Sequence, residues 1–329
     1  YFIYAIIIFT NKHIVNDKDH LPPTVNNIFN TYEDIMKDSG IYYSVGALLY
    51  TAADNAKIAE DIIFENFTIP FSLAFSFDTV SGDEEADRME NILAKTLDRI
   101  YMAKKDSDFY IPKLFMRVLS TAHISHIYKK FGSLLDLITG FILPDFSIAN
   151  MDIYLYEMQK INSALSTPVY IVPELDGASL MDMRKRYNSL YSIKERLDSY
   201  EDYTLTVLIS IGSVLNMLCV RHGVDENIYQ CGAVSQLLND IITVLGPDYV
   251  VAAPTFEYYS GIGWEEGLIR ELSLDRLHGF VGKTVISPKQ ILAVNTAYKV
   301  SGIDYDDALS LLAKVLYEGE RYFEVIKIC

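Results

Sequence analysis

The sequence is poor in basic residues and in cysteine. Of its 329 residues 28 are Lys or Arg, against 44 Asp or Glu, which gives a formal net charge of −16 at pH 7. Nucleic-acid-binding proteins usually carry a basic footprint, so we expect no nucleic-acid partner. The three cysteines are too few for a disulfide framework in a chain this long, and none stands in a CxxC pair, which excludes a zinc ribbon.

Proline, glycine and long hydrophobic runs are also scarce. With 10 Pro, 17 Gly and 50% hydrophobic residues, the composition excludes disordered and collagen-like chains and allows a large core. The apolar run at residues 1–10 (YFIYAIIIFT) is about half of the roughly 20 residues that cross a bilayer. We therefore predict a buried strand or docking segment there, no membrane partner, and a cytoplasmic protein.

Short apolar, β-rich runs alternate with stretches of helical period along most of the chain. Eight runs are candidate strands because they are nearly continuous in apolar residues, as strands buried on both faces are. They are residues 46–52, 71–77, 113–119, 138–143, 169–173, 205–211, 249–253 and 281–286. The helical patterns between and after them are residues 53–66, 83–101, 148–162, 176–197, 226–245, 264–277, 288–301 and 305–318.

Eight strands alternating with helices predict an α/β fold with a parallel sheet, and eight is the number that closes a (β/α)8 TIM barrel. A doubly wound open sheet is the alternative. No linker or repeat divides the chain, so we predict a single barrel domain at residues 41–329 preceded by an N-terminal extension at residues 1–40. In such a barrel, the reactive groups lie at the carboxyl ends of the strands.

Four carboxylates stand at these predicted strand ends: Asp78, Asp145, Glu174 and Asp176. Carboxylates there suit a magnesium site or an acid/base pair, whereas Asp at such junctions is also a common helix cap. Basic residues near strand ends are few, and they are Arg117, Arg221, Lys283 and Lys289. An anionic substrate would need a local basic pocket built from such residues, because the overall field is negative.

Other motifs are less specific. The GFVGKT segment at residues 279–284 has two residues between its glycines where a phosphate-binding P-loop needs four. His123 and His126 would share a helix face and could hold a metal, or they are exposed or capping side chains. Phe256, Tyr258 and Tyr259 would line a pocket or pack over the barrel.

The order of motifs resembles the HpcH/HpaI aldolase and citrate lyase β-subunit family, and most closely its C–C bond lyase branch associated with tellurite-resistance gene clusters. The resemblance covers residues 43–316. FSFDTV (75–80) is similar to an acidic LEDSV element, VPELD (172–176) to the fifth strand, and the long block 263–301 ends like the family's GK..IHP.QI.

The resemblance implies a TIM barrel that cleaves or forms a C–C bond next to a carboxylate or thioester, with magnesium assistance. The expected ligand is a small organic acid or an acyl-CoA, and family members often form homo-oligomers. Carried onto this sequence, Asp176 and Glu174 would hold Mg²⁺. Asp78 and Arg117 would be the catalytic pair, and Arg221 and Lys283 would bind substrate.

The sequence departs from the family pattern at most reactive positions. Where the family has arginine, glutamate, lysine, arginine, aspartate and histidine, this chain has Val45, Phe77, Asp145, Ser210, Leu215 and Ser287. Asp176 replaces a glutamate, and leucine at 215 cannot ligate magnesium, which takes oxygen ligands. The alternative is a catalytically depleted barrel that acts as a binding or assembly partner, for example of an active paralogue.

Overall fold

The computed structural model describes residues 41–78, 80, 82–304 and 306–307. The chain divides into two units, and the one described below is Val45–Ala297. The predicted extension at 1–40, and nearly all of the last predicted helix at 305–318, lie outside the described residues.

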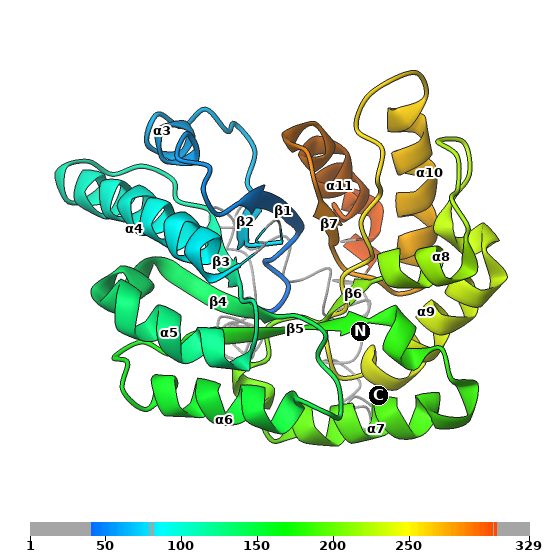
Figure 1. Cartoon of the computed structure of the whole chain (residues 1–329). Coiled ribbons are helices and arrows are strands. Elements are labelled where there is room, and N and C mark those ends of the chain that lie inside the picture. Colours follow the sequence, from blue (N-terminus) through cyan, green and yellow to red (C-terminus); the bar gives the residue numbers. More distant parts are fainter. Residues whose placement is uncertain (1–40, 79, 81, 305, 308–329) are drawn as a thin grey trace, which may run out of the picture. The chain divides into compact units, whose positions relative to one another are not determined.

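Seven parallel strands form one sheet in the order β6-β5-β4-β3-β2-β1-β7. They are β1 (Ala47–Ala52), β2 (Ser72–Ser76), β3 (Lys113–Arg117), β4 (Ile138–Leu143), β5 (Tyr170–Asp176), β6 (Leu208–Ser210) and β7 (Lys283–Val285). Neighbours in the first six follow chain order, which is the arrangement that right-handed β-α-β units produce. The strands curve into a nearly closed barrel with the helices outside it (Figure 1).

Residues 250–253 close the gap between β6 and β7. Val207 N donates to Val250 O at 2.8 Å on one side, and Ala253 N donates to Gly282 O at 3.0 Å on the other. The predicted strand at 249–253 is therefore present only as isolated bridges, because its bonds are divided between two partners and neither pairing is long enough for a regular ladder. Since this segment joins both edges, the barrel prediction is confirmed and the open sheet is excluded.

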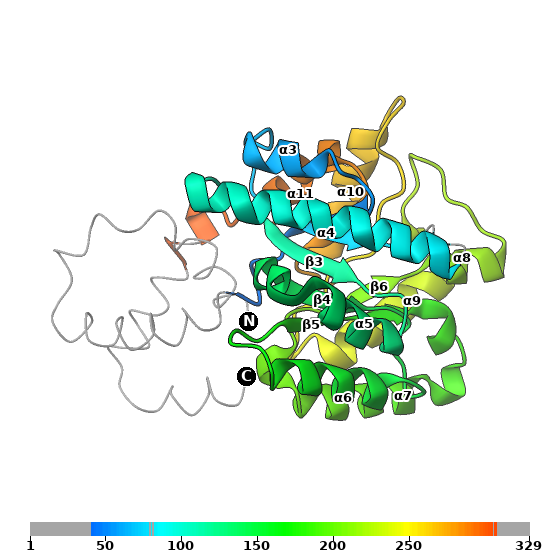
Figure 2. The same cartoon turned by 60° about the vertical axis from the view of Figure 1, so that its left-hand side comes forward.

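The outer layer consists of nine α-helices among the described residues of Val45–Ala297. They are α3 (Ile58–Ile63), α4 (Asp83–Asp106), α5 (Thr121–Phe131), α6 (Met151–Asn162), α7 (Met183–Asp198), α8 (Gly212–Leu218), α9 (Gly232–Leu245), α10 (Trp264–Leu277) and α11 (Ile291–Ala297). Figures 1 and 2 show α6 and α7 side by side, and α3 packs on α4 and α5 on α6 in the same ring. No helix in the described ranges is both long and apolar enough to cross a membrane.

The helix predictions differ from the structure where short 3-10 turns intervene. The turns inside predicted helices are Gly177–Leu180, Ile228–Gln230 and Pro288–Gln290, and two others, Gly132–Leu137 and Glu201–Tyr203, lie outside the predicted helices. The predicted helix at 176–197, for example, begins as the last residue of β5 and a 3-10 turn, because the Asp176 carboxylate caps that turn at Ala178 N. Helices α5 and α8 were not among the predicted helical patterns, and each begins within four residues of a strand end.

Core packing follows the expected periodicities. In α4, the buried residues Met89, Leu93, Leu97 and Ile100 recur every three or four positions and form one apolar face. All five residues of β2 are buried, as expected for a strand covered on both sides. Glu90 lies within the buried face of α4, and its charge needs partners there.

Candidate functional site

The candidate site is centred on Arg117, the last residue of β3. Its Nε donates to Glu174 Oε2 at 2.6 Å, and its Nη1 donates to Asp78 Oδ1. The three side chains therefore meet although they come from three different strand ends. The sequence named all three, but only the fold could bring them together at the carboxyl end of the barrel.

Strand register explains this meeting. Ser76 pairs with Arg117 across β2 and β3, and Asp78 follows Ser76 by two residues. Ser76 Oγ donates to Asp78 Oδ2 at 2.5 Å and accepts from Asp78 N at 3.2 Å, which orients the Asp78 carboxylate towards the guanidinium. Ser76 was not a predicted site residue, although its place two residues before Asp78 was an available signal.

Arg117 and Glu174 form a partly buried salt bridge. Burial raises the pKa of Glu174, and Arg117 opposes this rise. Burial also disfavours the charge of Arg117, but Glu174 and Asp78 outweigh it and raise the guanidinium pKa. Arg117 is therefore always charged, and two of its five N–H donors are used by the bonds described, so the others remain for an anion.

Asp176 lies two residues beyond Glu174 on β5 and therefore on the same face of the strand. Its Oδ1 accepts from Ser213 Oγ and, at 3.3 Å, from Ala178 N. Among the described residues, Asp176 Oδ2 and Glu174 Oε1 have no hydrogen-bond donor. Each carboxylate thus keeps one oxygen available to a ligand.

Tyr50 of β1 is a further polar group that interacts electrostatically with Glu174, Arg117 and Asp78, and it was not a predicted site residue. Its hydroxyl is buried and has no hydrogen-bond partner in the described chain. Burial raises the phenol pKa, Glu174 and Asp78 raise it further, and Arg117 opposes them. A tyrosine directly after two leucines in a strand predicted to be buried was the signal that could have identified it.

The other two predicted substrate contacts do not join this group. Lys283 is fully buried, and its Nζ lies 2.9 Å from both Glu271 Oε1 and Asp275 Oδ2 of α10. It therefore points from β7 to the helix layer and pairs with α10, not with Arg117. Arg221 is exposed in the segment after α8 and has no ion-pair partner in the described ranges.

Several residues that differ from the family pattern either pack in the core or cap a turn. Val45, Phe77 and Leu215 are buried, so apolar packing replaces the expected polar groups. Ser287 caps the turn Pro288–Gln290 by accepting from Lys289 N at 3.4 Å. Asp145 is exposed and has a positive φ of 51° after β4.

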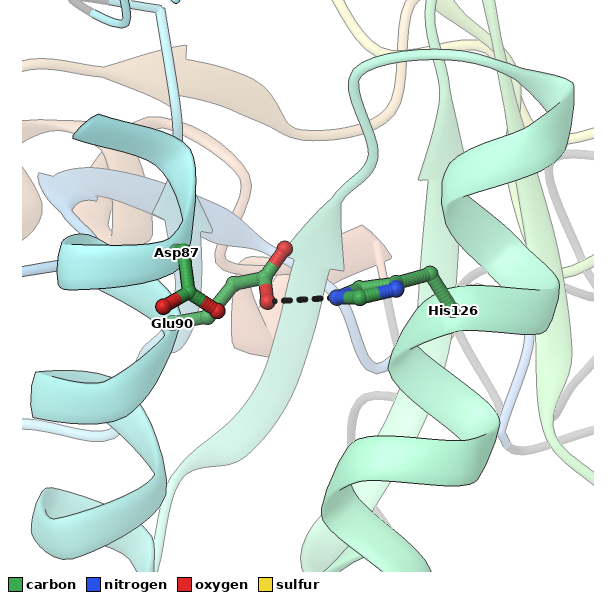
Figure 3. Close-up of side chains that lie close together, drawn as sticks. All are labelled: Asp87, Glu90 and His126. Carbon is green, nitrogen blue, oxygen red and sulfur yellow. Dashed lines mark hydrogen bonds and ion pairs between the residues drawn. The ribbon is translucent and has the colours of Figure 1, made fainter. Parts of the chain in front are cut away.

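A second cluster joins α4 to α5 (Figure 3). Asp87, Glu90 and His126 each offer a ligand atom within 4.8 Å of the others, and His126 Nε2 lies 3.0 Å from Glu90 Oε2. Lys130 Nζ, however, lies 2.5 Å from Asp87 Oδ1 and 2.8 Å from Glu90 Oε2. An ammonium group already stands between the carboxylates where a metal would have to bind, so the cluster is a closed ion network that joins the two helices.

His123 completes this network on its buried side. Its Nδ1 accepts from Leu119 N at 2.9 Å, so its other nitrogen must carry the proton that contacts Glu90 Oε1 at 2.7 Å. Burial lowers the pKa of His123. The histidine therefore fixes the turn that follows β3, immediately after Arg117, and it is buried rather than exposed.

Comparison with known proteins places this barrel in a family. The sequence model of the family described as C–C bond lyase of the TIM-barrel fold matches residues 40–324. None of the curated proteins compared with the chain matches it.

Solved structures give the same fold. One is CitE from Mycobacterium tuberculosis in complex with magnesium, acetoacetate and coenzyme A, with a TM-score of 0.52, 15% identity, and coverage of 82% of this chain and 87% of that chain. Another is RipC from Yersinia pestis, with a TM-score of 0.52, 12% identity, and coverage of 80% and 98%. At such identities the likeness shows the fold alone. Because the family match spans most of the sequence, the chain belongs to the C–C bond lyase family of TIM-barrel proteins.

Proposed function

We propose that the protein is a divergent C–C bond lyase that binds a small organic acid, free or as a coenzyme A thioester, at the carboxyl end of its barrel. The observation that carries the proposal is Arg117, a permanently charged guanidinium held by Asp78 and Glu174 at the end of β3. The CitE structure that contains acetoacetate, coenzyme A and magnesium supports the ligand class, since it shares the fold.

In this proposal Arg117 binds the carboxylate or carbonyl oxygen of the ligand, because a guanidinium pairs with planar oxyanions through two parallel N–H donors. Asp78, itself held by Ser76, and Glu174 fix the orientation of the guanidinium. A preoriented cation needs no reorganisation when negative charge develops on the ligand, and this is how such groups lower a reaction barrier.

The free carboxylate oxygens suit Mg²⁺, with Glu174 and Asp176 as its two protein ligands. Glu174 Oε1 and Asp176 Oδ2 each lack a protein donor, and the surrounding carboxylates outnumber the single guanidinium. Mg²⁺ usually takes one or two carboxylates and keeps several waters, so the buried Leu215 removes a third ligand without excluding the ion. When bound, the ion would act as a Lewis acid on an oxygen of the ligand.

The test is calorimetric titration of the whole protein with acetoacetate in the presence of MgCl₂. Wild type should bind, and Arg117→Met should weaken binding by about 10-fold or more, the value of a charge-assisted hydrogen bond. Arg99→Met is the matched control. Arg99 is exposed, and among the described residues its ion-pair partner is Glu60, 3.2 Å away. Absence of binding by wild type, or equal binding by Arg117→Met, would contradict the proposal.

A separate titration with MgCl₂ alone tests the two carboxylates. Asp176→Ala should abolish measurable Mg²⁺ binding, whereas Asp182→Ala should not, because Asp182 caps α7 by accepting from Arg184 N. If wild type binds acetoacetate equally well without Mg²⁺, the anion site stands and the metal assignment fails.

A second candidate function is a barrel without turnover that serves as a binding or assembly partner. Its support is that Val45, Phe77 and Leu215 complete the apolar core where polar groups are expected. A screen for release of a carbonyl product from hydroxy-acids and their coenzyme A thioesters separates the two functions. The homo-oligomeric state, the tellurite-resistance association and the cytoplasmic location remain predictions.

A further inference from the structure

The hydroxyl of Tyr50 lies on the barrel's inner face. Lys283 pairs with Ala47 across β7 and β1, and its side chain reaches outward to α10. Because side chains alternate along a strand, Ala47, Leu49 and Thr51 face the helices, and Leu48, Tyr50 and Ala52 face the interior. Tyr50 pairs with Ala74, two residues before Ser76, which pairs with Arg117, so Tyr50 and Arg117 share that inner face.

This hydroxyl differs from those of three other tyrosines that are buried or partly buried. Tyr154 donates to Pro144 O at 3.2 Å, Tyr200 to Leu155 O at 2.9 Å, and Tyr249 to Asp198 Oδ1 at 2.7 Å. The Tyr50 hydroxyl is shielded from solvent and has no partner among the described residues. A buried donor without a partner destabilises the folded state, and such costs persist where a ligand supplies the partner.

The charges around Tyr50 determine its protonation. Burial, and then Glu174, raise the phenol pKa well above its ordinary value. The group therefore stays protonated at neutral pH and acts as a hydrogen-bond donor. A donor beside a guanidinium is suited to an oxyanion, which can accept from both.

We propose that Tyr50 is a ligand-binding residue whose hydroxyl donates to the oxygen of the organic acid that Arg117 binds. The inference rests on the proposed function and deepens it, because it assigns a second donor to the same anion. The ligand class is a carboxylate with a neighbouring carbonyl, one oxygen of which accepts from both donors.

The experiment combines Tyr50→Phe with two measurements on the full chain: the thermal midpoint without ligand, and acetoacetate binding with MgCl₂. The variant should have an equal or higher Tm, because it removes a buried hydroxyl that has no partner. It should bind acetoacetate about 10-fold more weakly or worse, because the hydrogen bond to a charged acceptor is lost.

Tyr249→Phe is the matched control. It removes a hydroxyl that is bonded to Asp198, so it should lower Tm and leave acetoacetate binding unchanged. A lower Tm for Tyr50→Phe would mean that its hydroxyl has a structural partner, and this would overturn the inference.

The binding results separate the inference from the proposed function. If Arg117→Met loses binding and Tyr50→Phe binds like wild type, Tyr50 is not a ligand contact and the proposed anion site survives. If wild type does not bind acetoacetate, both proposals fail.

Discussion

Replacement of Lys283 by methionine tests the buried ion triad between β7 and α10. Lys283, Glu271 and Asp275 have no exposed surface, and one ammonium group serves both carboxylates at 2.9 Å. Glu271 Oε2 also accepts from Ile228 N at 3.2 Å, and Asp275 Oδ1 from Tyr229 Oη at 2.6 Å. Methionine keeps much of the lysine volume and removes the charge, so Lys283→Met isolates the electrostatic contribution.

The expected loss is about 3–5 kcal/mol in the free energy of unfolding, the usual cost of breaking a buried ion pair by removing one partner. Because domains are stable by roughly 5–15 kcal/mol, this is a large fraction of the total. The loss should grow as pH rises above the unfolded Asp pKa of about 3.9. Burial already raises the pKa of Asp275, so the folded variant holds a proton that the unfolded chain releases as pH rises.

The assay is urea unfolding followed by circular dichroism at pH 5 and pH 7.5. Lys194→Met is the control, since Lys194 also bridges two carboxylates, Asp198 at 3.0 Å and Asp248 at 2.9 Å, but at the surface. It should lose about 1 kcal/mol or less. The triple variant Lys283→Met, Glu271→Gln, Asp275→Asn should recover part of the lost stability, because it removes the two unpaired buried charges.

A loss below about 1 kcal/mol for Lys283→Met would refute this reasoning. So would weaker acetoacetate binding by a variant of unchanged stability, because Lys283 would then be the substrate contact that the sequence predicted.

Two further predictions concern packing and pH. Alanine normally favours a helix, but Gly267→Ala should lower Tm because its Cβ would lie 2.2 Å from Val224 O. The control is Gly232→Ala, whose Cβ would have no atom within 4 Å, and it should be neutral or stabilising. His123 has a pKa lowered by burial, so its contribution to stability is present above about pH 6.5 and is lost as pH falls through the folded pKa. Unfolding free energies from pH 7 to 5 should therefore decline in wild type and decline less in His123→Asn; equal slopes would contradict the assignment.

Much of the fold was predictable from local pattern. The continuous apolar runs located the strands because strands buried on both faces leave little room for polar residues. Helix α10 matches its predicted bounds at 264–277, which lie between Gly263 and Gly279. The segment 250–253 was harder to predict, because its hydrogen bonds depend on two partners distant in sequence.

The sequence by itself determined the residue types at the strand ends, and hence that Arg117, Asp78, Glu174 and Asp176 were the residues to examine. Tertiary structure decided which of them meet. It separated Lys283 from the site, because strand alternation directs that side chain to α10. It also revealed Tyr50, because the absence of a hydrogen-bond partner is a property of packing that no local pattern encodes.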